Sequence, residues 1–301
     1  PAATPALLPP PGPGHVPSQL PEEHRALMAL LVDVKGLRRA TQATPLDVEL
    51  LTLEDLDRKP LLEAKEVLLK LRDVVQRTEA IQTEIQALSN PESGPEPPGA
   101  RDALHSERAA LADRVLEYSN AVYEILPLQA GWQHPKALDR MRKVQGMLHH
   151  IETLLDVEYA KKVVLAARHR ASVRDPLDYA YAATGATLKA LSPAEDVYVM
   201  IAQYMQRGLQ AGGTPPKINA LFSVDCPAER NRFDRIGNHR LLWHGTHASN
   251  VIAILTQGLR VAPPDAESHG TAFGRGIYFA DVFRKSWAYC GGDRGRGEPQ
   301  Q

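Results

Sequence analysis

Apolar residues recur at spacings of three and four over the first part of the chain, and this period is typical of amphipathic helices. The first stripe consists of Leu27, Leu30, Leu31, Val34 and Leu37. The predicted helices begin at Glu22, after Pro60, near Asp102 and near Pro135. Proline- and glycine-containing loops separate them, so residues 22–170 predict an all-helical bundle.

The apolar segments become shorter after Asp175 and Pro176. One more helix is predicted over residues 193–209. Its shared face consists of Val197, Ile201, Tyr204 and Met205. Strand-like segments follow at residues 218–224, 240–243 and 276–280, with a helix at residues 249–257 among them. The predicted fold class is therefore α+β, an all-helical bundle followed by an incomplete mixed sheet.

Composition divides the chain into three parts. Residues 1–21 are rich in proline, alanine and glycine and are typical of a semi-rigid linker. The helical region covers residues 22–170, and the α+β region covers residues 171–301. Within the α+β region, the glycine-rich, charged tail at residues 291–301 is predicted to be disordered.

The bulk composition is that of a soluble globular protein, with 43% hydrophobic and 24% charged residues. The net charge of -1 provides no overall basic field for nucleic acid. Cys226 and Cys290 lack metal-ligand spacing, and two cysteines do not suggest a disulfide framework. A reducing compartment is therefore expected. No apolar run is long enough to predict a membrane span.

Four blocks in the α+β region carry candidate chemistry. They are residues 241–246 (LLWHGT), Asn250 with residues 254–264 (ILTQGLRVAPP), residues 273–281 (FGRGIYFAD) and residues 285–290 (KSWAYC). A single His-Gly pair after a strand is more often a turn with a capped histidine than a site. The order and spacing of the four blocks together are far more specific.

Together these blocks resemble the NAD-binding signature of poly(ADP-ribose) polymerases, which are diphtheria-toxin-like ADP-ribosyltransferases. Residues 46–53, 118–127 and 154–160 resemble the helical regulatory domain of the DNA-dependent members. Residues 175–178 (DPLD) resemble the start of their transferase domain. The resemblance extends over residues 22–290.

The resemblance implies that NAD+ is the substrate and that no metal is needed. It implies that the backbone N–H and C=O of Gly245 bind the nicotinamide carboxamide, and that a side chain on this glycine would obstruct the approach. The Ser286 hydroxyl supplies a third hydrogen bond, and the rings of Tyr278 and Tyr289 lie on either side of the nicotinamide.

Further roles follow from the same resemblance. His244 bonds a ribose hydroxyl, with Thr246 beside it. Asn250 and Arg260 hold the adenine-ribose end and the phosphates, and Lys285 lies near the reacting ribose. The catalytic candidates are His244, Tyr278 and Lys285.

Simpler interpretations stay open for several of these residues. Tyr278 and Tyr289 could be packed aromatics, and Ser286 could cap the helix that follows Phe283. Arg260 could form a surface ion pair of little energetic weight. A separate basic cluster of Arg232, Arg235 and Arg240 is more typical of a solvated face than of a nucleic-acid site.

The family's catalytic glutamate is expected on a strand well after the tyrosine block. Here the chain ends at Gln301, and Glu298 lies in the glycine-rich tail. We therefore expect this chain to be a fragment or a truncated form that is catalytically inactive by itself.

The resemblance implies that the parent protein is an NAD-dependent protein poly(ADP-ribosyl)transferase of the DNA-damage response in the nucleus. Its expected partners are protein acceptors, and DNA breaks reached through domains not in this chain, but no membrane. The helical domain is expected to shield the NAD site until DNA binding loosens it. The alternatives are mono(ADP-ribosyl) transfer and a catalytically inactive interaction module.

Overall fold

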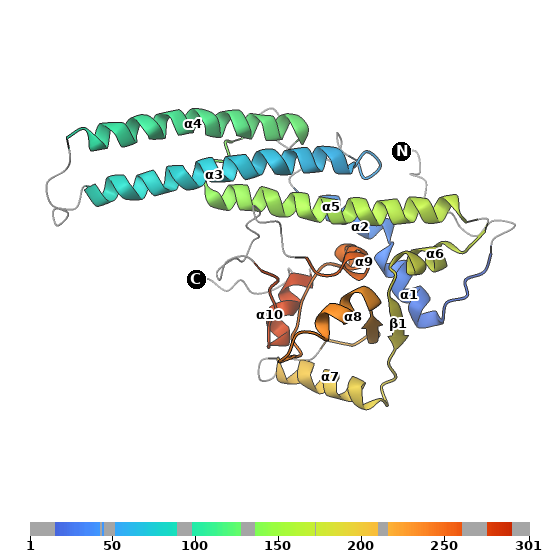
Figure 1. Cartoon of the computed structure of the whole chain (residues 1–301). Helices are drawn as coiled ribbons and strands as arrows, with labels where there is room; N and C mark the ends of the chain where they lie inside the picture. Colours follow the sequence, from blue (N-terminus) through green and yellow to red (C-terminus); the bar gives the residue numbers. More distant parts are fainter. Residues whose placement is uncertain are drawn as a thin grey trace. The chain divides into compact units, whose positions relative to one another are not determined.

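The computed structural model describes residues 16–42, 44, 52–88, 98–127, 136–171, 173–209, 216–260 and 276–290 (Figure 1). Most of the predicted linker, residues 46–51 of the segment 46–53 that resembles the regulatory domain, and the predicted disordered tail lie outside the described residues. Among the helices that are described, none is both long and apolar enough to cross a membrane.

The chain divides into two compact units. Unit 1 consists of residues 1–39, 159–260 and 277–301, and unit 2 consists of residues 40–158 and 261–276. The division does not fall at a single point, because the first helix belongs to unit 1 with the elements that follow residue 159. The predicted domain boundary at residue 170 stays a prediction.

Three long helices form unit 2. They are α3 (Arg58–Leu88), α4 (Ala100–Ile125) and α5 (Met141–His169), which continues into unit 1. Helices α3 and α4 pack along each other, and α5 lies beside α3 (Figure 1). Their buried faces supply Leu61, Ala64, Leu68, Leu71, Val75, Ile81, Val115, Val122, Val144, Leu148, Ile151 and Leu154. These residues recur at helical spacing, so burial of one stripe per helix explains why the segments are helical.

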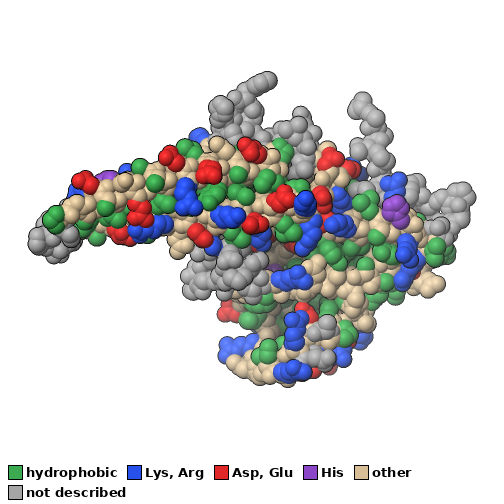
Figure 2. All heavy atoms as spheres, turned by 45° about the horizontal axis from the view of Figure 1, so that its top comes forward, with side chains coloured by type: hydrophobic (Ala, Val, Ile, Leu, Met, Phe, Trp, Pro, Cys, Tyr) green, Lys and Arg blue, Asp and Glu red, His purple; other side chains and the backbone are tan. Residues whose placement is uncertain are grey.

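Polar contacts fix the helices of unit 2 along their length. The buried hydroxyl of Ser119 donates to the Val115 carbonyl at 2.6 Å and accepts from the Leu138 N–H at 3.0 Å. On the surface, Arg77 of α3 forms ion pairs with Glu107 of α4 and with Glu84. Figure 2 shows acidic and basic side chains interspersed along the α3 and α4 hairpin. This face of the hairpin therefore presents no patch of one charge.

Unit 1 is built from short elements. They are α1 (Glu22–Leu31), α2 (Val34–Gln42, which ends in unit 2), α6 (Pro176–Ala183), β1 (Thr187–Ala190), α7 (Asp196–Arg207), β2 (Phe222–Asp225), α8 (Pro227–Phe233), α9 (Ala248–Gln257), α10 (Phe283–Trp287) and the 3-10 turn η2 (Ala288–Cys290). Strands β1 and β2 pair antiparallel, with Leu188 opposite Val224. Helix α1 packs on α6, α9 and β1, around the buried residues Met28, Leu31 and Leu188. Among the described residues the α+β fold class is confirmed.

Several sequence predictions need correction. The first stripe is not one helix, because α1 ends at Leu31 and α2 begins at Val34. Leu30 is 59% exposed and does not belong to the buried stripe. On α7 only Met205 is buried, whereas Val197 is 50% exposed.

The predicted strands are also shorter than expected. In the segments at residues 240–243 and 276–280, the structure has a single bridge between Trp243 and Ala280. Strand β1 and helices α6 and α8 had no counterpart in the predicted elements. Elements of four to eight residues carry too few periodic positions to be recognised from the pattern alone.

Candidate functional site

The site begins at the antiparallel bridge between Trp243 and Ala280, directly before the His-Gly sequence. The N–H of Trp243 donates to the Ala280 carbonyl at 2.7 Å, and the Ala280 N–H donates back at 2.8 Å. The Trp243 carbonyl accepts a further hydrogen bond from the Ser286 hydroxyl at 2.9 Å. One backbone carbonyl thus connects the strand end to helix α10.

His244 interrupts this ladder immediately after the bridge. In an antiparallel ladder, the next mutually hydrogen-bonded pair after Trp243 and Ala280 would be Gly245 and Tyr278. Instead, Nδ1 of His244 lies 3.0 Å from the Tyr278 carbonyl. Because a carbonyl only accepts, this bond places the proton on Nδ1 and leaves Nε2 of an exposed imidazole available.

Gly245 is consequently left with a free backbone amide. Among the described residues, neither its N–H nor its C=O has a hydrogen-bonding partner. Gly245 is half-buried, and its Cα faces helix α10. A Cβ at this position would overlap the Ser286 carbonyl and lie 3.2 Å from Sγ of Cys290. Only glycine fits there without displacing α10.

Ser286 lies next to this open amide and is 7% exposed. It is inside α10, whose N-cap is Val282. The alternative that Ser286 caps this helix is therefore wrong. While its hydroxyl donates to the Trp243 carbonyl, its oxygen keeps a lone pair that can accept a hydrogen bond from a ligand amide.

A second group of polar residues surrounds the start of α9. The Asn250 side-chain amide donates to the Thr246 hydroxyl at 3.2 Å, and the Ser249 hydroxyl donates to the Asn250 carbonyl oxygen at 3.1 Å. The side chain of Thr246, the residue after Gly245, is thus held beside that of Asn250 in the first turn of α9. This is the arrangement expected if both contact the same ligand.

The remaining predicted residues are less constrained. Tyr289 lies in η2 and is 61% exposed, so it is not a packed aromatic, whereas Tyr278 is half-buried. Lys285 is exposed on α10. Arg260 is exposed beyond α9, and within the described part of the chain it forms no ion pair. The structure therefore brings together His244, Gly245, Tyr278 and Ser286, and the side chains of Arg260 and Lys285 form no hydrogen bond or ion pair with them.

Tyr204 of α7 supports the site and was not singled out in the sequence. Its hydroxyl lies 2.9 Å from the Asp281 carbonyl and 3.2 Å from the Leu241 carbonyl, so it spans both sides of the strand pair. Its ring stacks on Trp243 with centroids 5.2 Å apart. The only sequence signal for Tyr204 was its place on one face of a predicted helix, which does not identify its partners.

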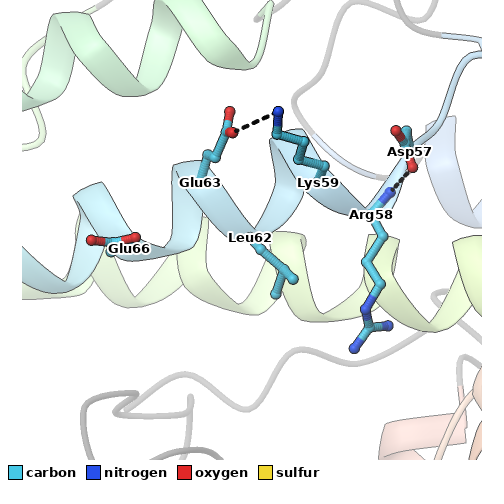
Figure 3. Close-up of a pocket in the computed structure, with 6 residues that line it drawn as sticks. All are labelled: Asp57, Arg58, Lys59, Leu62, Glu63 and Glu66. Atoms are coloured by element: carbon cyan, nitrogen blue, oxygen red, sulfur yellow. Dashed lines mark hydrogen bonds and ion pairs between the residues drawn. The ribbon is translucent and has the colours of Figure 1, made fainter.

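A surface hollow elsewhere contains none of these residues. It lies at the start of α3 and is lined by Asp57, Arg58, Lys59, Leu62, Glu63 and Glu66 (Figure 3). Figure 3 shows the Lys59–Glu63 ion pair and the bond from the Arg58 N–H to the Asp57 carboxylate, at 2.6 Å. Leu62 is the only apolar side chain in the lining and is 43% exposed. Such a charged, open surface does not resemble a small-molecule site.

No group of three or more His, Cys, Asp or Glu side chains in the described part of the chain could hold a metal ion.

Comparison with protein families gives a decisive match. The model for the regulatory domain of poly(ADP-ribose) polymerase matches residues 18–181, more than half of the chain. The chain belongs to the poly(ADP-ribose) polymerase family. The model for the catalytic domain of this polymerase matches residues 195–299, which include the strand end, α9 and α10.

Curated poly(ADP-ribose) polymerases resemble the chain over different extents. Poly [ADP-ribose] polymerase 1 of Caenorhabditis elegans is 36% identical over 186 residues, which is 60% of this chain and 20% of that protein. The polymerase 1 of Gallus gallus is 26% identical over 91% of this chain and 24% of its own length. Poly [ADP-ribose] polymerase 2 of Zea mays is 34% identical over 62% of this chain and 29% of its own length. The chain thus spans less than a third of each of these relatives.

Proposed function

We propose that this chain is the NAD-binding part of an NAD-dependent protein poly(ADP-ribosyl)transferase. The reaction releases nicotinamide from NAD+ and transfers ADP-ribose to protein acceptors. Membership of the poly(ADP-ribose) polymerase family and the names of the relatives support this assignment. The same resemblance supports an activity in the nucleus that responds to DNA breaks. Those breaks would be recognised by domains other than these 301 residues.

The open amide of Gly245 is the observation that carries the proposal. A nicotinamide carboxamide has one carbonyl acceptor and one NH2 donor. These are complementary to the N–H and C=O of Gly245, which have no hydrogen-bonding partner among the described residues. Ser286 lies against the same glycine and adds a third polar group. An amide held by one backbone unit and one fixed hydroxyl has a defined orientation, which is what positioning of the reacting bond requires.

The neighbouring residues fit the rest of the substrate. In the transfer, the bond between the nicotinamide nitrogen and C1′ of the ribose breaks, and nicotinamide leaves with the bonding electron pair. The acceptor then bonds to C1′ and gives up its proton. His244 keeps Nε2 available for a ribose hydroxyl, while Tyr278 and Tyr289 offer ring faces to the nicotinamide. Thr246, Asn250 and Arg260 would bind the adenosine end and the phosphates, and Lys285 would lie near the ribose.

Affinity for a benzamide-type mimic of nicotinamide tests the site without requiring turnover. Ser286→Ala should lose about one to two decades in affinity, since a ligand amide left unpaired costs about 1–3 kcal/mol. Gly245→Ala should lose at least as much, because the new methyl group overlaps the Ser286 carbonyl.

Two matched controls lie outside the site in unit 1. Ser223→Ala also removes a serine hydroxyl beside a backbone carbonyl, and Gly237→Ala places a methyl group where no atom lies within 4 Å. Both should bind the mimic as the unsubstituted chain does. If Ser286→Ala and Gly245→Ala also retain full affinity while remaining folded, Gly245 and Ser286 do not form a nicotinamide site.

Turnover is a separate question from binding. We expect a polypeptide limited to residues 1–301 to release little or no nicotinamide from NAD+, since the glutamate that follows Tyr289 within these residues, Glu298, has glycine and proline as its sequence neighbours rather than a strand-like sequence. Removing one preorganised contact to a transition state commonly costs about a hundredfold or more in rate. Robust nicotinamide release by this polypeptide would contradict the expectation, and the length of any product chain would separate poly from mono transfer.

A further inference from the structure

The segment between β2 and the candidate site closes into a compact turn. It consists of α8 and residues 234–240 (Figure 1). The ring of His239 stacks on the ring of Phe233, with centroids 3.8 Å and planes 19° apart. Nε2 of His239 lies 3.2 Å from the Phe233 carbonyl, and the Ile236 N–H donates to the same carbonyl at 2.9 Å. One carbonyl and one ring pair therefore hold the two ends of the turn together.

The ring pair lies at the surface and is not part of a core. Phe233 is 54% exposed, and His239 is also exposed. Burial therefore does not explain why the two rings are held against each other. A pair of aromatic rings fixed at the surface offers a planar group on which a nucleotide base can stack.

Three arginines flank the ring pair, and we call them the arginine cluster. They are Arg232, Arg235 and Arg240, and all three are exposed. No described acidic side chain forms an ion pair with them, although Asp234 lies among them in the sequence. The neighbouring Arg230, by contrast, is paired with Asp225. Guanidinium groups without a partner are available to bind phosphate through pairs of hydrogen bonds.

The turn brings the arginine cluster together around the rings. Arg232 directly precedes Phe233, and Arg240 directly follows His239, so the stacked rings hold both ends of the cluster close to each other. Arg232 and Arg235 are three residues apart across the turn that ends α8, which is the spacing of neighbours on one side of a helix. Two neighbouring guanidinium groups match the two linked phosphates of a pyrophosphate.

We propose that the arginine cluster and the Phe233–His239 pair form a docking surface for a chain of ADP-ribose units. Each unit carries an adenine ring that can stack and a pyrophosphate that the guanidinium groups can bind. The inference rests on the proposed function, whose product is this polymer. Arg240 lies four residues before His244, so their Cα atoms are at most about 14 Å apart. A polymer that grows at the candidate site therefore starts close to the surface that would hold it.

Other anionic partners match the surface less completely. The carboxylates of an acidic peptide would pair with the arginine cluster but would leave the exposed rings without a planar partner. Single-stranded DNA has bases, but a sugar separates each phosphate from the next, whereas a pyrophosphate places two phosphates together. At equal charge, the ADP-ribose polymer should therefore bind more tightly than either of them.

Fluorescence anisotropy with an end-labelled ADP-ribose polymer of defined length measures this binding without NAD+ or turnover. The 301-residue chain should bind the polymer, and the affinity should fall as the salt concentration rises. Arg232→Gln, Arg235→Gln and Arg240→Gln combined should reduce the slope of log affinity against log salt concentration by about two, since each contact with a phosphate of a single strand contributes about 0.7. Phe233→Leu should weaken binding about tenfold through the loss of stacking.

A second group of arginines in unit 1 provides the matched control. Arg168, Arg170 and Arg174 are exposed and form no ion pair with any described residue. No Phe, Tyr or Trp lies between Tyr159 and Tyr179, so this group has no ring pair beside it in the sequence. Glutamine at these three positions makes the same change in charge. It should leave the salt slope unchanged, because only arginines that contact phosphate contribute to it.

Three results would overturn the proposal. The first is an equal loss of affinity in both triple variants, which would assign binding to overall charge. The second is equal or tighter binding of an oligodeoxyadenylate or a polyglutamate of equal charge, which would assign the surface to another class of partner. The third is no binding of the polymer at low salt.

Affinity for the benzamide mimic separates this proposal from the proposed function. All substituted side chains are exposed, so the variants should remain folded and bind the mimic as the unsubstituted chain does. If the chain binds the mimic but not the polymer, the docking surface is refuted and the nicotinamide site stands. If it binds the polymer through the arginine cluster but does not bind the mimic, the docking surface stands and the nicotinamide site is refuted.

Discussion

Replacement of Asp156 by asparagine should stabilise unit 2 at neutral pH. Asp156 lies on α5, one turn after Glu152. Burial and the neighbouring Glu152 carboxylate raise the pKa of Asp156 from 3.8 to about 6. Glu152 has a partner of its own, because Nζ of Lys65 on α3 lies 3.4 Å from its carboxylate. Asp156 has neither an ion-pair partner nor a hydrogen-bond donor among the described side chains.

The sign and size of the effect follow from this raised pKa. A raised pKa means that the fold favours the protonated carboxyl, so its contribution to stability is complete below about pH 4 and is lost as the pH rises through about 6. A shift of about two units at 1.36 kcal/mol each corresponds to at most about 3 kcal/mol above pH 7. Asparagine has nearly the same shape and no charge to bury. Asp156→Asn should therefore match the unsubstituted chain near pH 4 and exceed it by up to about 3 kcal/mol near pH 7.5.

Urea denaturation followed by circular dichroism at several pH values provides the assay. Asp139→Asn is the matched control on the segment that leads into α5. The hydrogen bond from Lys143 holds the pKa of Asp139 below its usual value, so this substitution should lower stability at neutral pH and lose its effect in acid. If Asp156→Asn is neutral or destabilising at pH 7.5, or if its effect does not grow with pH, burial of the Asp156 charge is not costly and the reasoning fails.

Three further outcomes are expected. Gly208→Ala should destabilise unit 1 by about 1–3 kcal/mol, because the new Cβ would lie 2.6 Å from the backbone nitrogen of Phe283. An unchanged melting temperature in thermal denaturation would contradict this contact. Tyr204→Phe removes the hydroxyl beside the Leu241 and Asp281 carbonyls and should weaken binding of the benzamide mimic by up to about tenfold. Equal affinity would show that α7 does not support the site. Asp178→Asn should increase hydrogen exchange of the backbone amides of Gln19 and α1, since the neutral side-chain amide accepts more weakly from Ser18 and Gln19 than the carboxylate does. Unaltered exchange would show that the Asp178 carboxylate does not hold this segment in place.

The long helices could be predicted from the sequence because their information is local. In α3 and α5 the buried residues recur mostly every three or four positions over much of the helix, and in α4 they are Val115, Ser119 and Val122. The predicted and observed bounds of α3, α4 and α5 agree within a few residues at most ends. The four blocks of the α+β region likewise indicated the family, because the order and spacing of these blocks can be read from the sequence alone.

Tertiary structure decided what the short elements do. Strand β1 has four residues, and it is a strand because β2 pairs with one edge while His24 and Tyr181 cover Leu188 on the other. Tyr181 lies seven residues before Leu188, but His24 and the residues of β2 are distant in sequence. A pattern read along four residues has no access to them.

The candidate site shows the same division at the level of single atoms. Its residue types were predicted, but the free amide of Gly245 was not, because it results from competition for hydrogen-bond acceptors between segments far apart in the chain. The His244 ring bonds to the Tyr278 carbonyl, and the Ser286 backbone fills the space where a Cβ of residue 245 would lie. The sequence determined which groups are present, and the packing of α10 and the strand pair determined which of them remain free to bind a ligand.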